Sequence, residues 1–569
     1  MPAGCHTSTA TETLSMKTRT LSLLALALLA ACGGGDREAP AKGGEGQASS
    51  DDGIPEAQRF GGTAVVALGA DVADVNPITS TDANANGFQM FVMFTPVVHY
   101  NEKLEPIPGL ARRWELNADS TELTFHLRND IHWQDGPKTT AYDLKLAYDL
   151  SRQPEAGFAN SSFWTHYGES AAPDSFTFKV RLRPHAEYMD PWRTFFAMPS
   201  HVFKDVKAAE LATHPFNTST PVANGPFRFV SRAAGQNWIF EANPNYPKEL
   251  GGRPYLDRLV VRAIPEATTR MRELLSGNVD YYVAVTPDQA QQVQNSTTAR
   301  LVTFPFRAYT LIAWNQRREM FKDVRVRQAL TMAINKQAII DGILKGYGQV
   351  ANASVPSLYW QSDTTVGREV RYNPEGARRL LAQAGWEDRN RDGVLENAQG
   401  QPFRFTLKTN SGNQERRDIA EVVQSQLKAV GVDAQLSILE FNTLIEQLND
   451  VKARPFDAVV MGWVAEFKID DENLFSCDKM DEPYQWVGYC NPRTTALLDT
   501  LPLIVDREQA RPLWREYQRL IAQDQPYTFL YFQQRIEGVS NRLRNVNPDA
   551  RGDLVGVAKW YIHPGQRAR

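Results

Sequence analysis

The sequence predicts a mixed α/β fold, and the clearest signal lies within residues 403–463. There, three strand-like runs (FRFTL, VDAQLSIL and FDAVVMGW) alternate with two amphipathic segments of helical period. Strands joined by crossover helices form a parallel sheet with helices on its faces. Ligands bind beyond the carboxyl ends of such strands, so the loop after Gly462 and Trp463 is the first place where we expect a site.

The N-terminal half is predicted to be richer in strands, and the middle of the chain to contain capped helices. Residues 121–127 alternate apolar and polar side chains, and residues 225–240 have the pattern of a hairpin with its turn near Gly235. Asp323 precedes an apolar stripe that predicts a helix, and Asn373-Pro374 begins another, which Gly385 ends.

The composition excludes several classes of protein. A formal charge of −4 over 569 residues gives no general attraction to nucleic acid, and 42% hydrophobic with 22% charged residues is typical of a globular protein. The sequence contains no GxSxG, HExxH, GxxxxGK[ST] or strand-linked GxGxxG motif, which argues against the usual hydrolases, zinc proteases and nucleotide-binding enzymes. No two of its 9 histidines have the i, i+4 spacing of a helical metal site. We therefore expect no catalytic residues, no resident metal and no cofactor.

The N-terminal segment predicts export. Residues 16–32 (MKTRTLSLLALALLAAC) combine two cationic residues with an apolar run too short to span a bilayer core of about 30 Å. The residues before Cys32 resemble the lipobox of bacterial lipoproteins, which implies cleavage and acylation at Cys32. We therefore expect a signal peptide over residues 1–31, with Met16 as a candidate true start, and a flexible linker over 32–55. An ordinary secretory signal with a chance cysteine stays open.

Four ordered blocks indicate a family. They are IPGLARRWELNADSTELTFHLRNDIHWQDGPKTTAYDL, GGRPYLDRLVVRAIPEATTRMRELLSGNVDY, FKDVRVRQALTMAINKQAII and YNPEGARRLLAQAGW. Over roughly residues 60–545 the chain resembles the dipeptide-, oligopeptide- and nickel-binding proteins of bacterial ABC importers. The resemblance implies a two-lobe periplasmic binding protein of type II, of the large class with an extra N-terminal subdomain. It also implies a monomer that captures a ligand and delivers it to a membrane permease with ATPase subunits.

The resemblance also implies that the chain crosses a hinge twice. We expect the crossings near residues 304–309 and 531–535. Lobe one would then comprise residues 56–305 and 534–569, and lobe two residues 306–533.

Relatives that bind peptides place an acid three positions after the Trp of a Gly-Trp pair, where it pairs with the amino terminus of the ligand. The matching residue here is Glu466, and a buried ammonium group needs such an anionic partner. Gly462 and Trp463 would line the pocket, although core packing of Trp463 stays open. Dipeptide-specific relatives hold the opposite end of the ligand with an Arg at the position of Asn410. We expect Asn410 to contact the ligand here, and the missing Arg favours oligopeptides over strict dipeptides.

The acids at 470–472 are rivals for the role of Glu466. Two other function classes stay open: a solute-binding protein for an oligosaccharide or metal complex, and a lipid-anchored hydrolase. Asp388 to Gln399 imitates an EF-hand loop but has Gln at the twelfth position, so we expect a solvated turn. In an exported protein, Cys477 and Cys490 should form a disulfide, and similar relatives carry a comparable pair; two free buried thiols are the alternative.

Overall fold

One mixed sheet of eleven strands organises most of the chain. In the computed structural model, the described residues are 53–80, 83–119, 121–158, 164, 167–182, 195–465, 469–504 and 506–567. The sheet order is β15-β14-β16-β12-β17-β11-β1-β10-β9-β8, with β13 paired to β17. Its strands are β1 (Thr63–Leu68), β8 (Phe227–Ala233), β9 (Asn237–Ala242), β10 (Arg258–Ala263), β11 (Tyr281–Tyr282), β12 (Ala299–Trp314), β13 (Gly348–Val350), β14 (Arg404–Asn410), β15 (Asp433–Leu439), β16 (Ala458–Val464) and β17 (Tyr527–Ser540).

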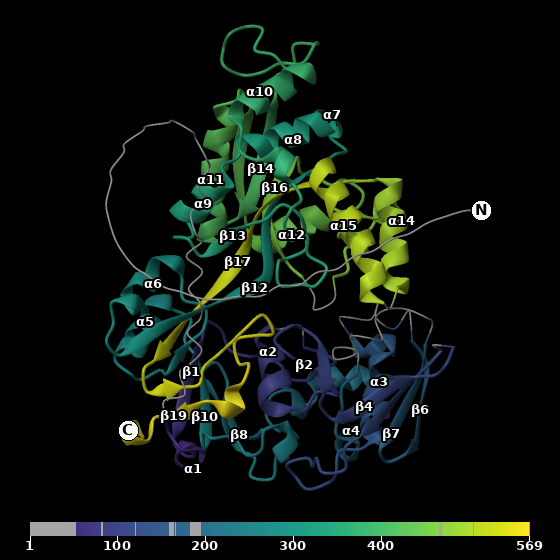
Figure 1. Ribbon diagram of the computed structural model, residues 1–569, viewed down its shortest axis with the longest axis vertical. Helices are drawn as coiled ribbons and strands as arrows, with labels where there is room; N and C mark the ends of the chain where they lie inside the picture. The colour runs from purple at the N-terminus through teal and green to yellow at the C-terminus, as the bar shows by residue number, and fades with distance from the viewer. Residues whose placement is uncertain are drawn as a thin grey trace, which may run out of the picture. The chain divides into compact units, whose positions relative to one another are not determined.

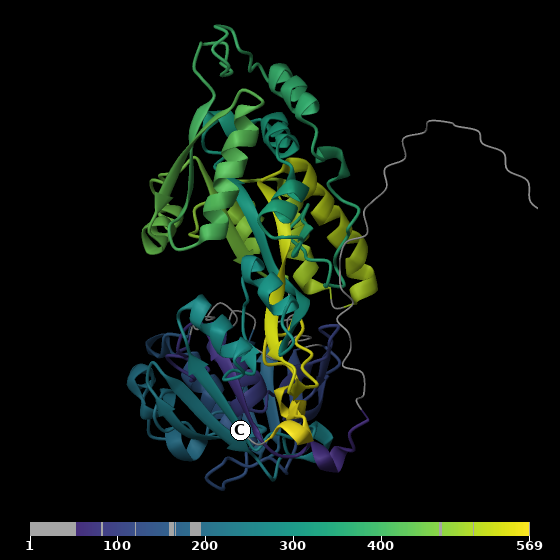
Figure 2. The ribbon, with the colours of Figure 1, turned by 90° about the vertical axis from the view of Figure 1, so that its left-hand side faces the viewer.

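The two longest strands, β12 and β17, connect the two lobes. They run antiparallel beside one another, and Figures 1 and 2 show both passing from one group of elements into the other. Their register shifts between Pro305 and Tyr309, and irregularities of this kind bend a strand pair. The segments 304–309 and 531–535, which the sequence predicts as hinge crossings, both lie within this pair of strands.

The predicted β-α-β-α-β unit is confirmed. β14 is parallel to both β15 and β16, and the connecting helices are α11 (Gln414–Lys428) and α12 (Phe441–Asn449). Asn413 caps α11 by accepting a hydrogen bond from the backbone N–H of Arg416. Ile419, Val423 and Leu427 form the buried face of this helix, which explains its helical period in the sequence.

The two capped helices are also confirmed. Asp323 caps α8 (Val324–Ala333) and Asn373 caps α10 (Pro374–Gln383). The other α-helices are α1 (Glu56–Arg59), α2 (Ala83–Gly87), α3 (Ala141–Ser151), α4 (Ser200–Phe203), α5 (Ala267–Leu275), α6 (Pro287–Gln294), α7 (Glu319–Lys322), α9 (Lys336–Gly342), α13 (Glu472–Phe475), α14 (Pro492–Thr500) and α15 (Arg507–Asp524).

A separate antiparallel sheet, in the order β4-β5-β7-β6, forms an additional layer in the N-terminal half. Its strands are β4 (Ala111–Leu116), β5 (Glu122–Leu127), β6 (Tyr167–Asp174) and β7 (Thr177–Leu182). The predicted strand at 121–127 is therefore confirmed as β5, and the predicted hairpin at 225–240 as β8 and β9. The remaining strands are β2 (Val98–Tyr100), β3 (Pro106–Pro108), β18 (Leu543–Arg544) and β19 (Tyr561–Ile562).

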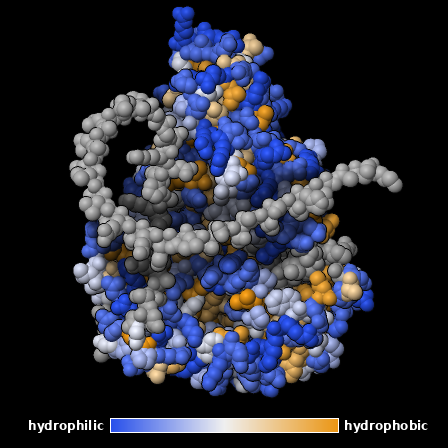
Figure 3. Space-filling view, viewed as in Figure 1, coloured by the Kyte–Doolittle hydropathy of each residue, from blue (hydrophilic) through white to orange (hydrophobic). Residues whose placement is uncertain are grey.

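The face in Figure 3 is largely hydrophilic, with apolar residues scattered over it. Across the described ranges, no helix combines the length and apolarity needed to cross a membrane. The predicted signal peptide and the predicted acylation site, Cys32, lie outside the described residues.

Candidate functional site

Two of the predicted site residues meet around a single arginine. Asn410 ends β14, and its side-chain Oδ1 accepts a hydrogen bond of 3.0 Å from Nη1 of Arg416 in the first turn of α11. Gly462, in β16, lies against the same guanidinium, since a Cβ atom there would be 3.0 Å from Arg416 Nη2. Burial lowers the pKa of Arg416. The C-terminal ends of these strands therefore hold a half-buried cation.

The structure packs Trp463 against other aromatic residues. Its ring meets Tyr484 at a centroid distance of 5.8 Å and Trp486 at 5.4 Å, both edge to face. Trp486 is only 2% exposed. Trp463 thus belongs to a packed aromatic cluster, although its half-buried side chain stays near the strand end.

Glu466 lies outside the described residues, but the residue before it, Ala465, is held by hydrogen bonds at both its backbone N–H and its backbone carbonyl group. The backbone N–H of Ala465 donates to the carbonyl oxygen of Arg307 at 2.7 Å. The guanidinium of Arg307, 7% exposed, donates in turn to the carbonyl oxygen of Ala465 and to that of Ala550. The buried Arg307 therefore determines where the segment leading to Glu466 begins.

The three acids that rival Glu466 lie in different environments. Asp470 is exposed, and Glu472 forms an ion pair of 3.3 Å with Lys479. Asp471 is 6% exposed and accepts hydrogen bonds from Ser354 Oγ at 2.5 Å and Tyr517 Oη at 2.6 Å. Asp471 therefore joins three segments of the fold, and its carboxyl group is engaged within the protein.

Burial raises the pKa of Asp471 to about 6, because desolvation outweighs the hydrogen bonds from Ser354 and Tyr517. The folded protein thus holds this proton more tightly than the unfolded chain, whose Asp has a pKa of about 4. Stability should therefore fall as the pH rises from about 4 to 6, by roughly 3 kcal/mol from this residue. Asp471→Asn should remove that contribution to the slope, as measured by urea unfolding at pH 4, 5, 6 and 7.

An exposed aspartate away from this site provides the control for this experiment. Asp499→Asn should keep the slope of the unchanged protein, because Asp499 is exposed to solvent on α14 and does not act on the Asp471 carboxyl. Equal slopes for Asp471→Asn and the unchanged protein would contradict the assignment.

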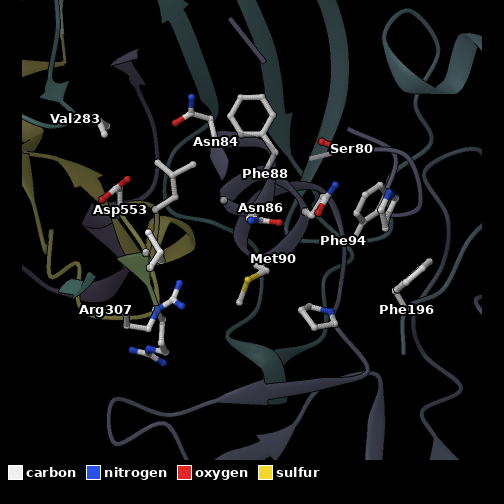
Figure 4. A pocket seen from close by; sticks show the side chains of 18 of the residues that line it. Ser80, Asn84, Asn86, Phe88, Met90, Phe94, Phe196, Val283, Arg307 and Asp553 are labelled. Atoms are coloured by element: carbon white, nitrogen blue, oxygen red, sulfur yellow. The ribbon is translucent and has the colours of Figure 1, made fainter. Parts of the chain in front are cut away.

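A cavity of about 500 Å³ lies beside the hinge strands. Figure 4 shows Arg307 and Asp553 on one side, Phe196 on the other, and Asn86 and Met90 between them. Its walls are mainly apolar and aromatic, with a few amides and charged groups, the usual character of a ligand pocket. The lining residues are Leu68, Pro77, Ser80, Asn84, Asn86, Gly87, Phe88, Gln89, Met90, Phe94, Thr95, Pro96, Phe158, Phe195, Phe196, Ala197, Val283, Phe306, Arg307, Val464, Arg535, Arg551, Gly552, Asp553 and Leu554.

The sequence did not predict this cavity, although two signals pointed near it. Arg307 and Arg535 lie in the two predicted hinge segments, and Val464 directly follows the Gly-Trp pair. The remaining lining residues come from distant parts of the chain and share no motif. Arg416 lies in the first turn of α11 and belongs to no motif in the sequence.

The structure contains a disulfide between Cys477 and Cys490, whose Cα atoms are 4.5 Å apart. It closes the loop that carries Tyr484 and Trp486, the two rings that pack against Trp463. The disulfide therefore supports the aromatic cluster next to the strand end.

The acidic turn near residue 390 is the segment that imitates an EF-hand loop in sequence. Carboxylate oxygens of Asp388, Asp392 and Glu396, which could in principle bind a metal ion, lie within 4.8 Å of one another. However, these carboxylates accept hydrogen bonds from the backbone N–H groups of Gly393, Val394 and Arg389, respectively. These hydrogen bonds explain why the three carboxylates lie close together: each of them stabilises the backbone of the turn.

Comparisons with known proteins agree with this architecture. The family of bacterial extracellular solute-binding proteins, family 5 (middle region), matches residues 105–481. The oligopeptide-binding protein AppA of Bacillus subtilis is 30% identical over 505 residues, covering 88% of this chain and 92% of that protein. The dipeptide-binding protein of Escherichia coli is 24% identical over 470 residues, covering 79% of this chain and 85% of that protein.

A solved structure extends the similarity to three dimensions. The structure of B. subtilis AppA in complex with a nonapeptide has a TM-score of 0.74 and 29% identity, covering 89% of this chain and 99% of that one. The protein has the two-lobe fold of these relatives. The chain therefore belongs to family 5 of the bacterial extracellular solute-binding proteins.

Proposed function

We propose that the chain is a lipid-anchored, extracytoplasmic component of an ABC importer that captures oligopeptides between its two lobes and delivers them to a membrane permease. The observation that carries this proposal is the similarity to the oligopeptide-binding protein AppA over 92% of its length. That a solved AppA structure contains a nonapeptide favours ligands longer than two residues.

The lobe boundaries and the anchor are part of the same proposal. Lobe one comprises residues 56–305 and 534–569, and lobe two comprises 306–533. The lobes move about the paired strands β12 and β17, whose register shift gives a local bend. A ligand stabilises the closed state through contacts that the open state lacks. Acylated Cys32 and the following linker tether the protein in the periplasm.

Three residues are assigned to the ligand. Glu466 pairs with the amino terminus of the peptide, and the Ala465 peptide unit that precedes it is held by Arg307. Arg416 presents its cation beside Gly462, and Asn410, whose Oδ1 accepts a hydrogen bond from that guanidinium, contacts the ligand beside it. Trp463 contributes to the wall behind this site. The backbone of the peptide is held by strand-like hydrogen bonds.

The proposal is tested by calorimetric titration of the protein with penta-alanine and with its N-acetylated form. Removing the charged amine should weaken binding at least tenfold, because an interaction between buried charges is lost. Glu466→Gln should weaken binding of the free-amine peptide and bring the two affinities to within about threefold of each other.

Glu421→Gln, an exposed residue on α11, is the matched control and should leave both affinities unchanged. If neither peptide binds, the peptide assignment is contradicted, and an oligosaccharide or a metal complex becomes the expected ligand. Equal binding of both peptides by the unchanged protein would contradict only the role of Glu466.

A further inference from the structure

Among the described residues, six phenylalanines line the cavity beside the hinge. Its rings come from widely separated parts of the chain. Phe195 is 2% exposed, Phe94 and Phe158 are each 7% exposed, and Phe196 and Phe306 are half-buried. The two partly exposed rings, Phe196 and Phe306, offer apolar contact area to another flat ring, in stacked or edge-to-face geometry. The buried rings pack within the core and fix the shape of the wall.

An unusual backbone forms one wall of the cavity. α2 continues directly into η1 (Phe88–Met93), a π-helix, and π-helical turns occur mostly at functional sites. Phe88 and Met90, both buried, anchor this wall, and Asn86 lies between the two sides of the cavity. The wide turn thus shapes the cavity and is itself a reason to assign it a function.

Guanidinium groups lie on the hinge side. Arg535, on β17, stacks over the ring of Phe306 at 4.4 Å from the centroid, and Arg307, on β12, lies 5.8 Å from it. Guanidinium groups also stack on aromatic rings of a ligand, through cation–π attraction and planar contact. An aromatic side chain entering this cavity meets apolar walls on one side and arginines on the other.

We propose that this cavity is a side-chain pocket that takes an aromatic side chain from the bound peptide, within the first few residues of its amino end. This inference rests on the proposed function. The position along the peptide follows from the chain: Val464 lines the cavity, and Glu466, the assigned partner of the amino terminus, is two residues farther on. Two residues span at most about 7 Å, so the two subsites are near neighbours.

Arginines at the cavity would by themselves favour an acidic side chain of the peptide. However, these arginines already interact with carboxylates and carbonyl groups of the protein, which argues against an acidic ligand side chain. Arg551 makes paired hydrogen bonds to the carboxylate of Asp549, and Arg535 lies 3.6 Å from that of Asp553. Arg307 donates to two backbone carbonyl groups. A carboxylate entering the cavity would lose water against aromatic walls and would compete with acids already present.

A set of pentapeptides tests the inference by calorimetry. Phe, Tyr, Leu or Glu replaces one alanine of penta-alanine at each of positions 1–4. At one of these positions, Phe should bind about tenfold more tightly than Ala, with Leu between them and Glu giving no gain.

Two results would overturn the pocket while the proposed function stands: Glu binding most tightly, or equal affinities at every position. Failure of every peptide to bind, penta-alanine included, would instead contradict the proposed function and the pocket together.

A substitution that fills the cavity distinguishes binding in this pocket from binding in the rest of the cleft. Asn86→Trp should reduce the ratio of Phe-peptide to Ala-peptide affinity from about tenfold to near one. Asn278→Trp, on the exposed surface after α5, is the matched control and should leave the ratio unchanged. If Asn86→Trp fails to fold, Phe196→Leu serves in its place and should lower the same ratio severalfold. An unchanged ratio in the folded variant would contradict the pocket.

Discussion

Asp280→Asn should lower the free energy of unfolding by about 3–5 kcal/mol, the usual cost of removing one partner of a buried ion pair. The Asp280 side chain has no solvent exposure and binds the guanidinium of Arg542 through two hydrogen bonds, of 2.5 and 2.7 Å. The same carboxylate accepts the backbone N–H of Val65 at 2.9 Å. The substitution leaves the Arg542 charge buried without its anion, and it loosens the junction of β1, β11 and the end of β17.

Urea unfolding measures this loss. The control is Asp149→Asn, which breaks an exposed ion pair with Lys145 on α3 and should cost no more than about 1 kcal/mol. A cost for Asp280→Asn as small as that of the control would contradict the structural role of the buried pair.

Replacing both Cys477 and Cys490 by Ser should lower stability by about 3 kcal/mol, the value expected for a closed loop of this size. The two cysteines lie 13 positions apart in the sequence, and their loop carries Trp486, which is 2% exposed. Because this loop supports Trp463, the double variant should also change the fluorescence of the aromatic cluster.

Comparing the two proteins with and without a thiol reductant provides the control. A thiol reductant should destabilise the unchanged protein and leave the double variant unaffected. Equal urea midpoints for the two proteins under oxidising conditions would contradict a stabilising disulfide.

Local signals carried most of what the sequence predicted about the fold. Asp323 and Asn373, the two predicted caps, each accept a backbone hydrogen bond at the start of a helix, so these starts depend on residues close to one another in the chain. The β-α-β-α-β unit followed for the same reason, since its strands and helices alternate over short connections. The signals for these elements are local, because a capping residue and the apolar stripe that follows it begin within about one helical turn of each other.

Tertiary arrangement accounts for what the sequence did not predict. The cavity wall is formed by a π-helix, and nothing in the pattern of Phe88–Met93 distinguishes it from an α-helix. Arg307 positions Ala465 because β12, β16 and the C-terminal loop meet in the folded protein. These segments are far apart in the sequence, so no local pattern predicts this role. Trp463, predicted to line the pocket, packs against rings that lie more than 20 residues farther along the chain.

Native mass spectrometry of the purified protein, followed by denaturing release of whatever copurifies with it, tests the central claim most directly. The account predicts released peptides of several residues, enriched in sequences with an aromatic residue near the amino end. A released sugar or metal complex would contradict the claim, as would a protein that is reproducibly empty and that no peptide library can fill.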